Sequence, residues 1–126
     1  MTLRTERVRV QIRREIATLL ERGEVKDPRL TGVVSISDVE VSRDLSYATV
    51  YFSILGAGAS AEAMEDAGAA LNHAAGFIRS RLARRLKIRQ IPILRFVKDN
   101  SFEYGSQIDR LLQSLHIPPV EEKDKT

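Results

Sequence analysis

Residues 67–98 read AGAALNHAAGFIRSRLARRLKIRQIPILRFVK, and this stretch sets the second half of the fold. Its small side chains predict a helix that ends near Ala74-Ala75-Gly76. A glycine inside a helix costs about 1 kcal/mol relative to alanine, so Gly76 favours a bend or a close packing contact at this point. Pro92 then precedes a short strand predicted at residues 93–97.

Positive charge is concentrated in the same stretch. It holds eight basic residues and no acidic one, whereas the whole chain has a net charge of +3, so the other residues sum to −5. Ile78, Leu82 and Leu86 form an apolar stripe at i, i+4 spacing, and most of the basic side chains lie on the opposite arc. A solvated helix face is the alternative interpretation, but such faces usually mix both signs of charge. We therefore predict a surface for nucleic-acid phosphates, made by Arg79, Arg81, Arg84, Arg85, Lys87 and Arg89, with a kink at Ala74, Ala75 and Gly76 that exposes backbone N–H groups.

The residues before this stretch predict a helix and a hairpin. Apolar residues recur at helical spacing over about residues 4–22, and Gly23 is a natural end for that helix. In a strand predicted at residues 33–42, the apolar residues change from even to odd positions near Ser37-Asp38. This change predicts a β-bulge that keeps both halves facing the core. Alternation over residues 47–54 predicts a second, antiparallel strand.

The predicted elements make a single α+β domain in the order α-β-β-α-(kink)-α-β-α. Its three-stranded sheet is expected to carry helices on one side, with a last helix capped by Ser101. A length of 126 residues with 43% hydrophobic residues suits one domain, which we assign to residues 1–117, followed by a disordered tail at residues 118–126. This order is compatible with K-homology folds, which bind nucleic acid near a junction of two helices.

Composition excludes several classes of function. The chain has no cysteine, its N-terminus is charged, and no apolar run reaches the ~18 residues of a membrane span, so we expect a soluble, cytoplasmic protein. Its two histidines lack catalytic or metal-ligand spacing, which predicts no enzyme activity, metal, cofactor or small-molecule substrate. Gly56-Ala57-Gly58 resembles part of a dinucleotide-binding motif, but no acidic residue follows about 20 positions later.

Five segments in order resemble the ribosome-binding factor A family, over about residues 7–115. They are DPRL (27–30), VEVSRDLSYA (39–48), AAGFIR (74–79), LKIRQIP (86–92) and DNS (99–101) followed by Gly105. The resemblance implies a type II K-homology-like domain in which an Ala-x-Gly kink, here Ala74-Ala75-Gly76, replaces the usual glycine-containing RNA clamp. It also implies a bacterial factor that binds the small (30S) ribosomal subunit and its 16S rRNA late in maturation, supports 5′-end processing of the precursor rRNA, and is needed for growth in the cold.

The sequence departs from the family pattern at Ile93, where an acidic residue is common, and in its short C-terminal tail. We expect a non-catalytic monomer. A metal-dependent nuclease and a protein-binding module remain as alternatives. The nuclease would use the hairpin carboxylates Asp38, Glu40 and Asp44, and the protein-binding module would use Glu62, Glu65 and Asp66. The basic residues of the first predicted helix can extend the basic surface: Arg4, Arg7, Arg9, Arg13 and Arg14.

Overall fold

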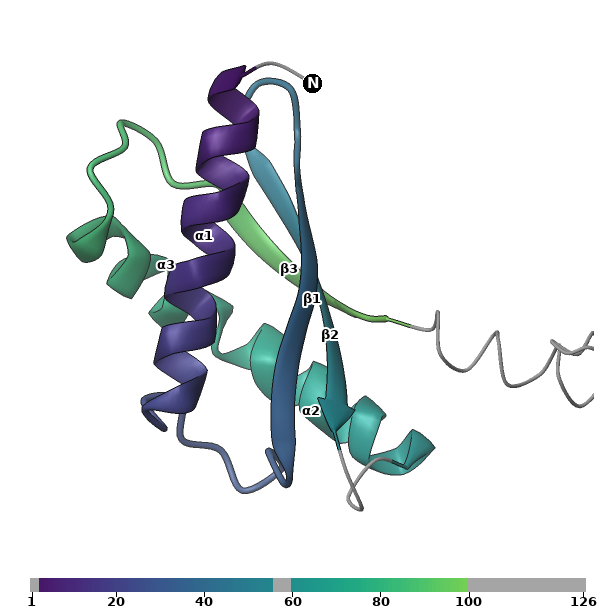
Figure 1. The fold of residues 1–126 in the computed structure, drawn as a ribbon. Coiled ribbons are helices and arrows are strands. Elements are labelled where there is room, and N and C mark those ends of the chain that lie inside the picture. The colour runs from purple at the N-terminus through teal and green to yellow at the C-terminus, as the bar shows by residue number, and fades with distance from the viewer. Residues whose placement is uncertain (1–2, 56–59, 100–126) are drawn as a thin grey trace, which may run out of the picture.

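The computed structural model describes residues 3–55 and 60–99 (Figure 1). Within them, the order of elements confirms the predicted α-β-β-α-(kink)-α-β. The last helix expected from Ser101, the domain boundary after residue 117 and the glycine motif at residues 56–58 lie outside the described residues. The elements are α1 (Leu3–Glu21), β1 (Val33–Val41), β2 (Tyr47–Leu55), α2 (Ala61–His73), α3 (Ala75–Arg85) and β3 (Ile93–Lys98).

The three strands form one sheet in the order β1-β2-β3. Strand β1 is antiparallel to β2, and β2 is parallel to β3. The register shifts in β1, because Ile36 lies opposite Phe52 whereas Asp38 lies opposite Tyr51, which leaves Ser37 as the extra residue. The predicted bulge is thus confirmed, and it places Ile36 and Val39 on the same buried face.

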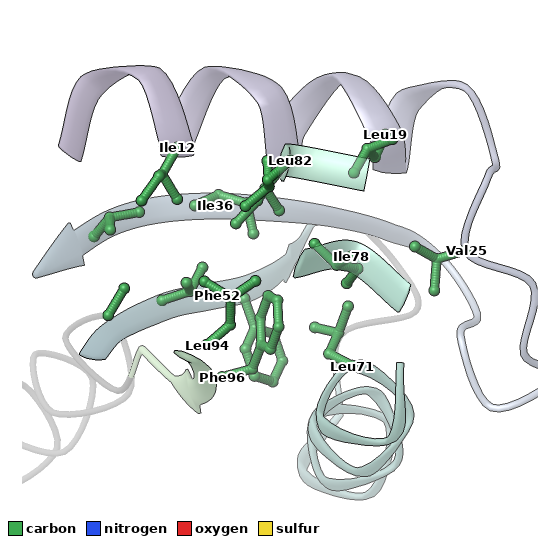
Figure 2. Packing of buried hydrophobic residues seen from close by; sticks show 14 of the residues in the cluster. Ile12, Leu19, Val25, Ile36, Phe52, Leu71, Ile78, Leu82, Leu94 and Phe96 are labelled. Atoms are coloured by element: carbon green, nitrogen blue, oxygen red, sulfur yellow. The ribbon is translucent and has the colours of Figure 1, made fainter. Parts of the chain in front are cut away.

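The helices all cover one face of the sheet (Figure 1). Ile12 of α1, Leu71 of α2 and Ile78 of α3 have no exposed surface and belong to one hydrophobic cluster with the buried side chains of the strands. Figure 2 shows Phe52, Phe96 and Leu71 close together where α2 meets the sheet. On the opposite face no helix packs among the described residues. Of the helices within residues 3–55 and 60–99, none is long and apolar enough to cross a membrane.

Helix α1 ends as its sequence predicts. Gly23 has a φ of +67°, a left-handed conformation that glycine adopts without steric cost. The N–H of Gly23 donates to the carbonyl of Leu20 at 3.1 Å, and the N–H of Glu24 donates to that of Leu19 at 3.0 Å. This pair of bonds is the Schellman motif, which satisfies the last carbonyls of the helix. It turns the chain so that Glu24 leaves the end of α1 toward α3.

The kink lies slightly before Gly76. Helix α2 ends at His73 and α3 begins at Ala75, with Ala74 between them at φ −87° and ψ 3°. A Cβ added to Gly76 would meet no atom within 4 Å, so close packing does not explain this glycine. The close approach of helix to sheet occurs instead at Gly68, where an added Cβ would lie 3.4 Å from Cζ of Phe52. The bend is confirmed, and the helix comes nearer to the sheet at Gly68 than at Gly76.

Candidate nucleic-acid interface

The basic helix α3 buries one face and exposes the other. Ile78 and Leu82 have no exposed surface, and Leu86 is partly buried against the same core, which confirms the apolar stripe. Arg84 is exposed on the other side of the helix. The six predicted basic residues therefore belong to α3 and to the linker, residues 86–92, that leads to β3.

Arg79 holds this linker in place. Its Nε donates to the carbonyl of Ile91 at 3.1 Å and to that of Pro92 at 3.2 Å, and its Nη2 donates to Ile91 at 2.9 Å. These bonds satisfy carbonyl groups just before β3 begins, where no strand partner is available to them. Because the guanidinium is engaged with main-chain oxygens, its first role is to fix the linker that carries Lys87 and Arg89.

Arg81 and Arg85 face one carboxylate of α1 and one that directly follows it. Arg85 lies 3.5 Å from a carboxylate oxygen of Glu24 and 3.7 Å from one of Glu15, and Nε of Arg81 lies 3.9 Å from Glu24. The guanidinium carbon of Arg81 also lies 5.1 Å from the centre of the Phe77 ring, within the range of a cation–π contact. Part of the charge on α3 is thus balanced inside the protein, an arrangement that no local sequence pattern indicated.

The other three basic residues of the predicted surface remain open to solvent. Arg84, Lys87 and Arg89 are exposed, and none of them makes an ion pair or a hydrogen bond within residues 3–55 and 60–99. Lys87 and Arg89 line a hollow of about 590 Å³ whose other wall is the start of α1. That wall contributes Arg4 and Arg7, so the structure brings together two of the α1 arginines with two of the predicted residues.

The remaining α1 arginines point elsewhere. Arg9 binds Glu6 and lies 3.0 Å from a carboxylate oxygen of Asp38, and its side chain lowers the pKa of Glu6 below the ordinary value. Arg13 and Arg14 line a second hollow, between α1 and β1, which also contains the acidic Glu21 and apolar side chains. They do not join the surface of α3 and the linker.

The hairpin carboxylates are engaged with groups of the hairpin and of α1. Asp38 accepts bonds from the side chain of Arg9 and from the N–H of Val39, at 3.0 and 2.8 Å. Glu40 accepts from the Tyr51 hydroxyl at 2.9 Å, which raises the pKa of Tyr51. Asp44 accepts from the N–H of Ser46 and the hydroxyl of Ser42, at 3.1 and 2.9 Å. In the described part of the chain, no three His, Cys, Asp or Glu side chains are placed to hold a metal ion.

The acidic face of α2 has one internal partner. Glu65 forms an ion pair with Lys98 at the end of β3, so it contributes to the attachment of α2. Glu62 and Asp66 are exposed beside it. The two open carboxylates leave little charge for an electrostatic docking surface, and the protein-binding alternative gains no specific observation.

Comparisons with known proteins identify the family and the fold of this chain. The sequence profile of the ribosome-binding factor A family matches residues 4–112. A ribosome-binding factor A of Magnetococcus marinus is 48% identical over 126 residues, which cover 100% of this chain and 99% of that protein. The crystal structure of ribosome-binding factor A from Thermus thermophilus superposes with a TM-score of 0.60 at 29% identity, covering 75% of this chain and 94% of that one.

Another match describes a complex with the ribosomal subunit. A homology model of the Thermus thermophilus ribosome binding factor A, fitted into a cryo-EM map of its complex with the 30S subunit, matches with a TM-score of 0.58 at 28% identity. It covers 73% of this chain and 91% of that one. The K-homology-like α+β fold is therefore confirmed by the crystal structure of a relative. This chain belongs to the ribosome-binding factor A family.

Proposed function

We propose that this chain binds the small ribosomal subunit and contacts its 16S rRNA during late maturation. The observation that carries the proposal is the 30S complex of the Thermus thermophilus relative, which has the same fold at 28% identity. The basic surface of α3 and the linker supports it, because guanidinium and ammonium groups pair with phosphate oxygens regardless of base sequence.

The contact is made first by the cations that are free to meet phosphates. Arg84, Lys87 and Arg89 are exposed and make no ion pair with the described part of the chain. Arg81 and Arg85 join only if phosphate replaces their carboxylate partners. The kink contributes the start of α3, where Ala74 supplies no side-chain cap and the backbone N–H groups favour an anion.

The protein acts by occupancy. It holds immature rRNA in one conformation while the 5′ end of the precursor is processed by other enzymes, and it leaves when the mature subunit no longer offers that conformation. This role requires neither a catalytic group nor a cofactor. We propose that a single copy acts on each subunit, in the cytoplasm where ribosomes assemble.

Co-sedimentation with purified small subunits tests the proposal. Immature and mature subunits are compared across a salt series, and we expect preferential binding to the immature form that weakens steeply as salt increases. The absence of binding to either form, at low salt and with folded protein, would contradict the proposed function.

A charge-removal variant tests the surface. Arg84→Ala/Lys87→Ala/Arg89→Ala should weaken subunit binding and flatten its salt dependence. The matched control is Arg13→Ala/Arg14→Ala/Arg95→Ala, which removes the same charge from exposed positions on α1 and β3, outside α3 and the linker. Equal losses in the two variants would show that net charge matters and that this surface does not.

A further inference from the structure

A basic groove lies between the start of α1 and the linker that follows α3. Figure 1 shows that linker, in green, passing beside the N-terminal half of α1. The groove has a volume of about 590 Å³ and is backed by the buried side chain of Leu45. Its two walls are separated by some eighty residues in sequence, so only the fold brings them together.

The walls carry four cations and no opposing charge. Arg4 and Arg7 come from α1, Lys87 and Arg89 from the linker, and the described residues that line the groove include no carboxylate. None of the four makes an ion pair with the described part of the chain. Four like charges around one hollow create a positive potential there, which attracts an anion with several negative groups.

Other arginines of the protein show the contrast. Arg9 is on the same helix and is held by two carboxylates, and Arg85 on α3 lies between two more. The protein thus balances its cations where they support the fold. The four cations of the groove have no carboxylate partner among residues 3–55 and 60–99.

We propose that this groove binds consecutive phosphates of the RNA backbone, and that Arg4 and Arg7 extend the interface from the linker onto α1. The identity of the ligand as RNA rests on the proposed function. The chemistry of the groove favours the backbone, because the described residues that line it include no aromatic side chain on which a base could stack. Gln11 and Gln90 add neutral amides that can bond to phosphate or sugar oxygens.

The test compares two pairs of arginines on the same helix. Arg4→Ala/Arg7→Ala removes the α1 wall of the groove, and Arg13→Ala/Arg14→Ala removes the same charge from the other hollow. Binding is measured to deproteinised 16S rRNA and to intact small subunits across a salt series, with thermal unfolding as a check that both variants fold. For the groove variant we expect affinity for both to fall by about tenfold or more, because two charge-assisted contacts are lost.

The salt dependence gives a second readout. Loss of two phosphate contacts should make the log–log slope of affinity against salt shallower by about 1.4 for single-stranded RNA, and the control variant should keep most of the wild-type slope. Equal effects of the two variants would overturn the assignment of the groove. So would loss of subunit binding with unchanged binding to free rRNA, which would indicate a ribosomal protein as the ligand.

Failure of this inference and failure of the proposed function are distinguishable. If wild-type protein binds subunits and the Arg4→Ala/Arg7→Ala variant binds them equally well, only the groove is wrong. If wild-type protein does not bind subunits at all, the function itself is wrong.

Discussion

Asn72 and Phe96 exchange two hydrogen bonds between a helix and the edge of the sheet. Nδ2 of Asn72 donates to the carbonyl of Phe96 at 2.9 Å, and the N–H of Phe96 donates to Oδ1 of Asn72 at 2.8 Å. Strand β3 is an edge strand, so these main-chain groups have no neighbouring strand within the sheet. The side-chain amide takes the place of that neighbour and fixes the end of α2, directly before the kink, against β3.

Replacement of Asn72 should therefore destabilise the fold. Asn72→Ala leaves a donor and an acceptor of Phe96 unpaired, and we expect the free energy of unfolding to fall by about 1–3 kcal/mol. Asn72→Asp keeps the acceptor and loses the donor, so its carboxylate meets the Phe96 carbonyl and stability should also fall. Urea denaturation measures both, with His73→Ala as an exposed control. Wild-type stability in Asn72→Ala would show that water replaces the amide without cost.

Periodicity predicted the elements of this fold because it reports on local burial. In β1 the apolar residues change from even to odd positions near Ser37. Both halves of the strand can then face the core only if the strand contains a bulge, and the register with β2 shows this bulge. Gly23 likewise marked the end of α1, since a left-handed residue there satisfies the last carbonyls. Both signals are carried by neighbouring residues, which is why the sequence alone was sufficient.

The candidate site was only partly predictable, for the same reason. Charge density located α3 and the linker, but a run of arginines carries no information about its partners. Glu24 is 61 residues from Arg85 in sequence. Only the packing of α1 on α3 brings them within ion-pair distance, and the same packing places Arg4 and Arg7 beside the linker. Asn72 carried no signal, because an asparagine near a helix end ordinarily suggests no more than a cap.

Gly76→Ala should stabilise the protein. The position is exposed and helical, and an added Cβ meets nothing within 4 Å, so alanine lowers the entropy of the unfolded chain without strain. We expect an increase of about 0.4–1 kcal/mol in the free energy of unfolding, measured by urea denaturation.

Binding of the Gly76→Ala variant to 16S rRNA provides the complementary readout. If RNA approaches the backbone of the kink closely, the stabilised variant should bind more weakly, and unchanged affinity would show that the glycine has no contact role.

The turn after α1 should be sensitive to acid. Asp27 accepts bonds from the N–H and the guanidinium of Arg29, at 2.8 to 3.1 Å, and these lower its pKa from 3.8 to about 2. Since the folded pKa is depressed, this stabilisation is complete above about pH 4 and is lost as the pH falls toward 2. Carboxyl carbon NMR should show Asp27 titrating near pH 2, and Arg29→Ala should move the midpoint up toward 3.8. An unchanged midpoint in that variant would assign the shift to another cause.

Glu24 should limit how many cations the protein offers to RNA. It lies 3.5 Å from Arg85 and 3.9 Å from Arg81, so phosphate must compete with its carboxylate for both. Glu24→Gln removes that competitor. We expect tighter binding to 16S rRNA and a log–log salt slope steeper by about 0.7 for each additional phosphate contact. Because Glu24 and its two arginine partners are partly exposed, the free energy of unfolding should change by less than about 1 kcal/mol.

The matched control for this change is Glu21→Gln. Glu21 is an exposed acid at the same end of α1, and in the described part of the chain it faces the other hollow, away from α3. Both substitutions raise the net charge by one, so general attraction to RNA would affect them equally. A steeper slope for Glu24→Gln alone would identify Arg81 and Arg85 as cations that RNA gains when the carboxylate is removed. Equal slopes would mean that Arg81 and Arg85 make no contact with RNA, and that the open cations of α3 and the linker bind RNA without them.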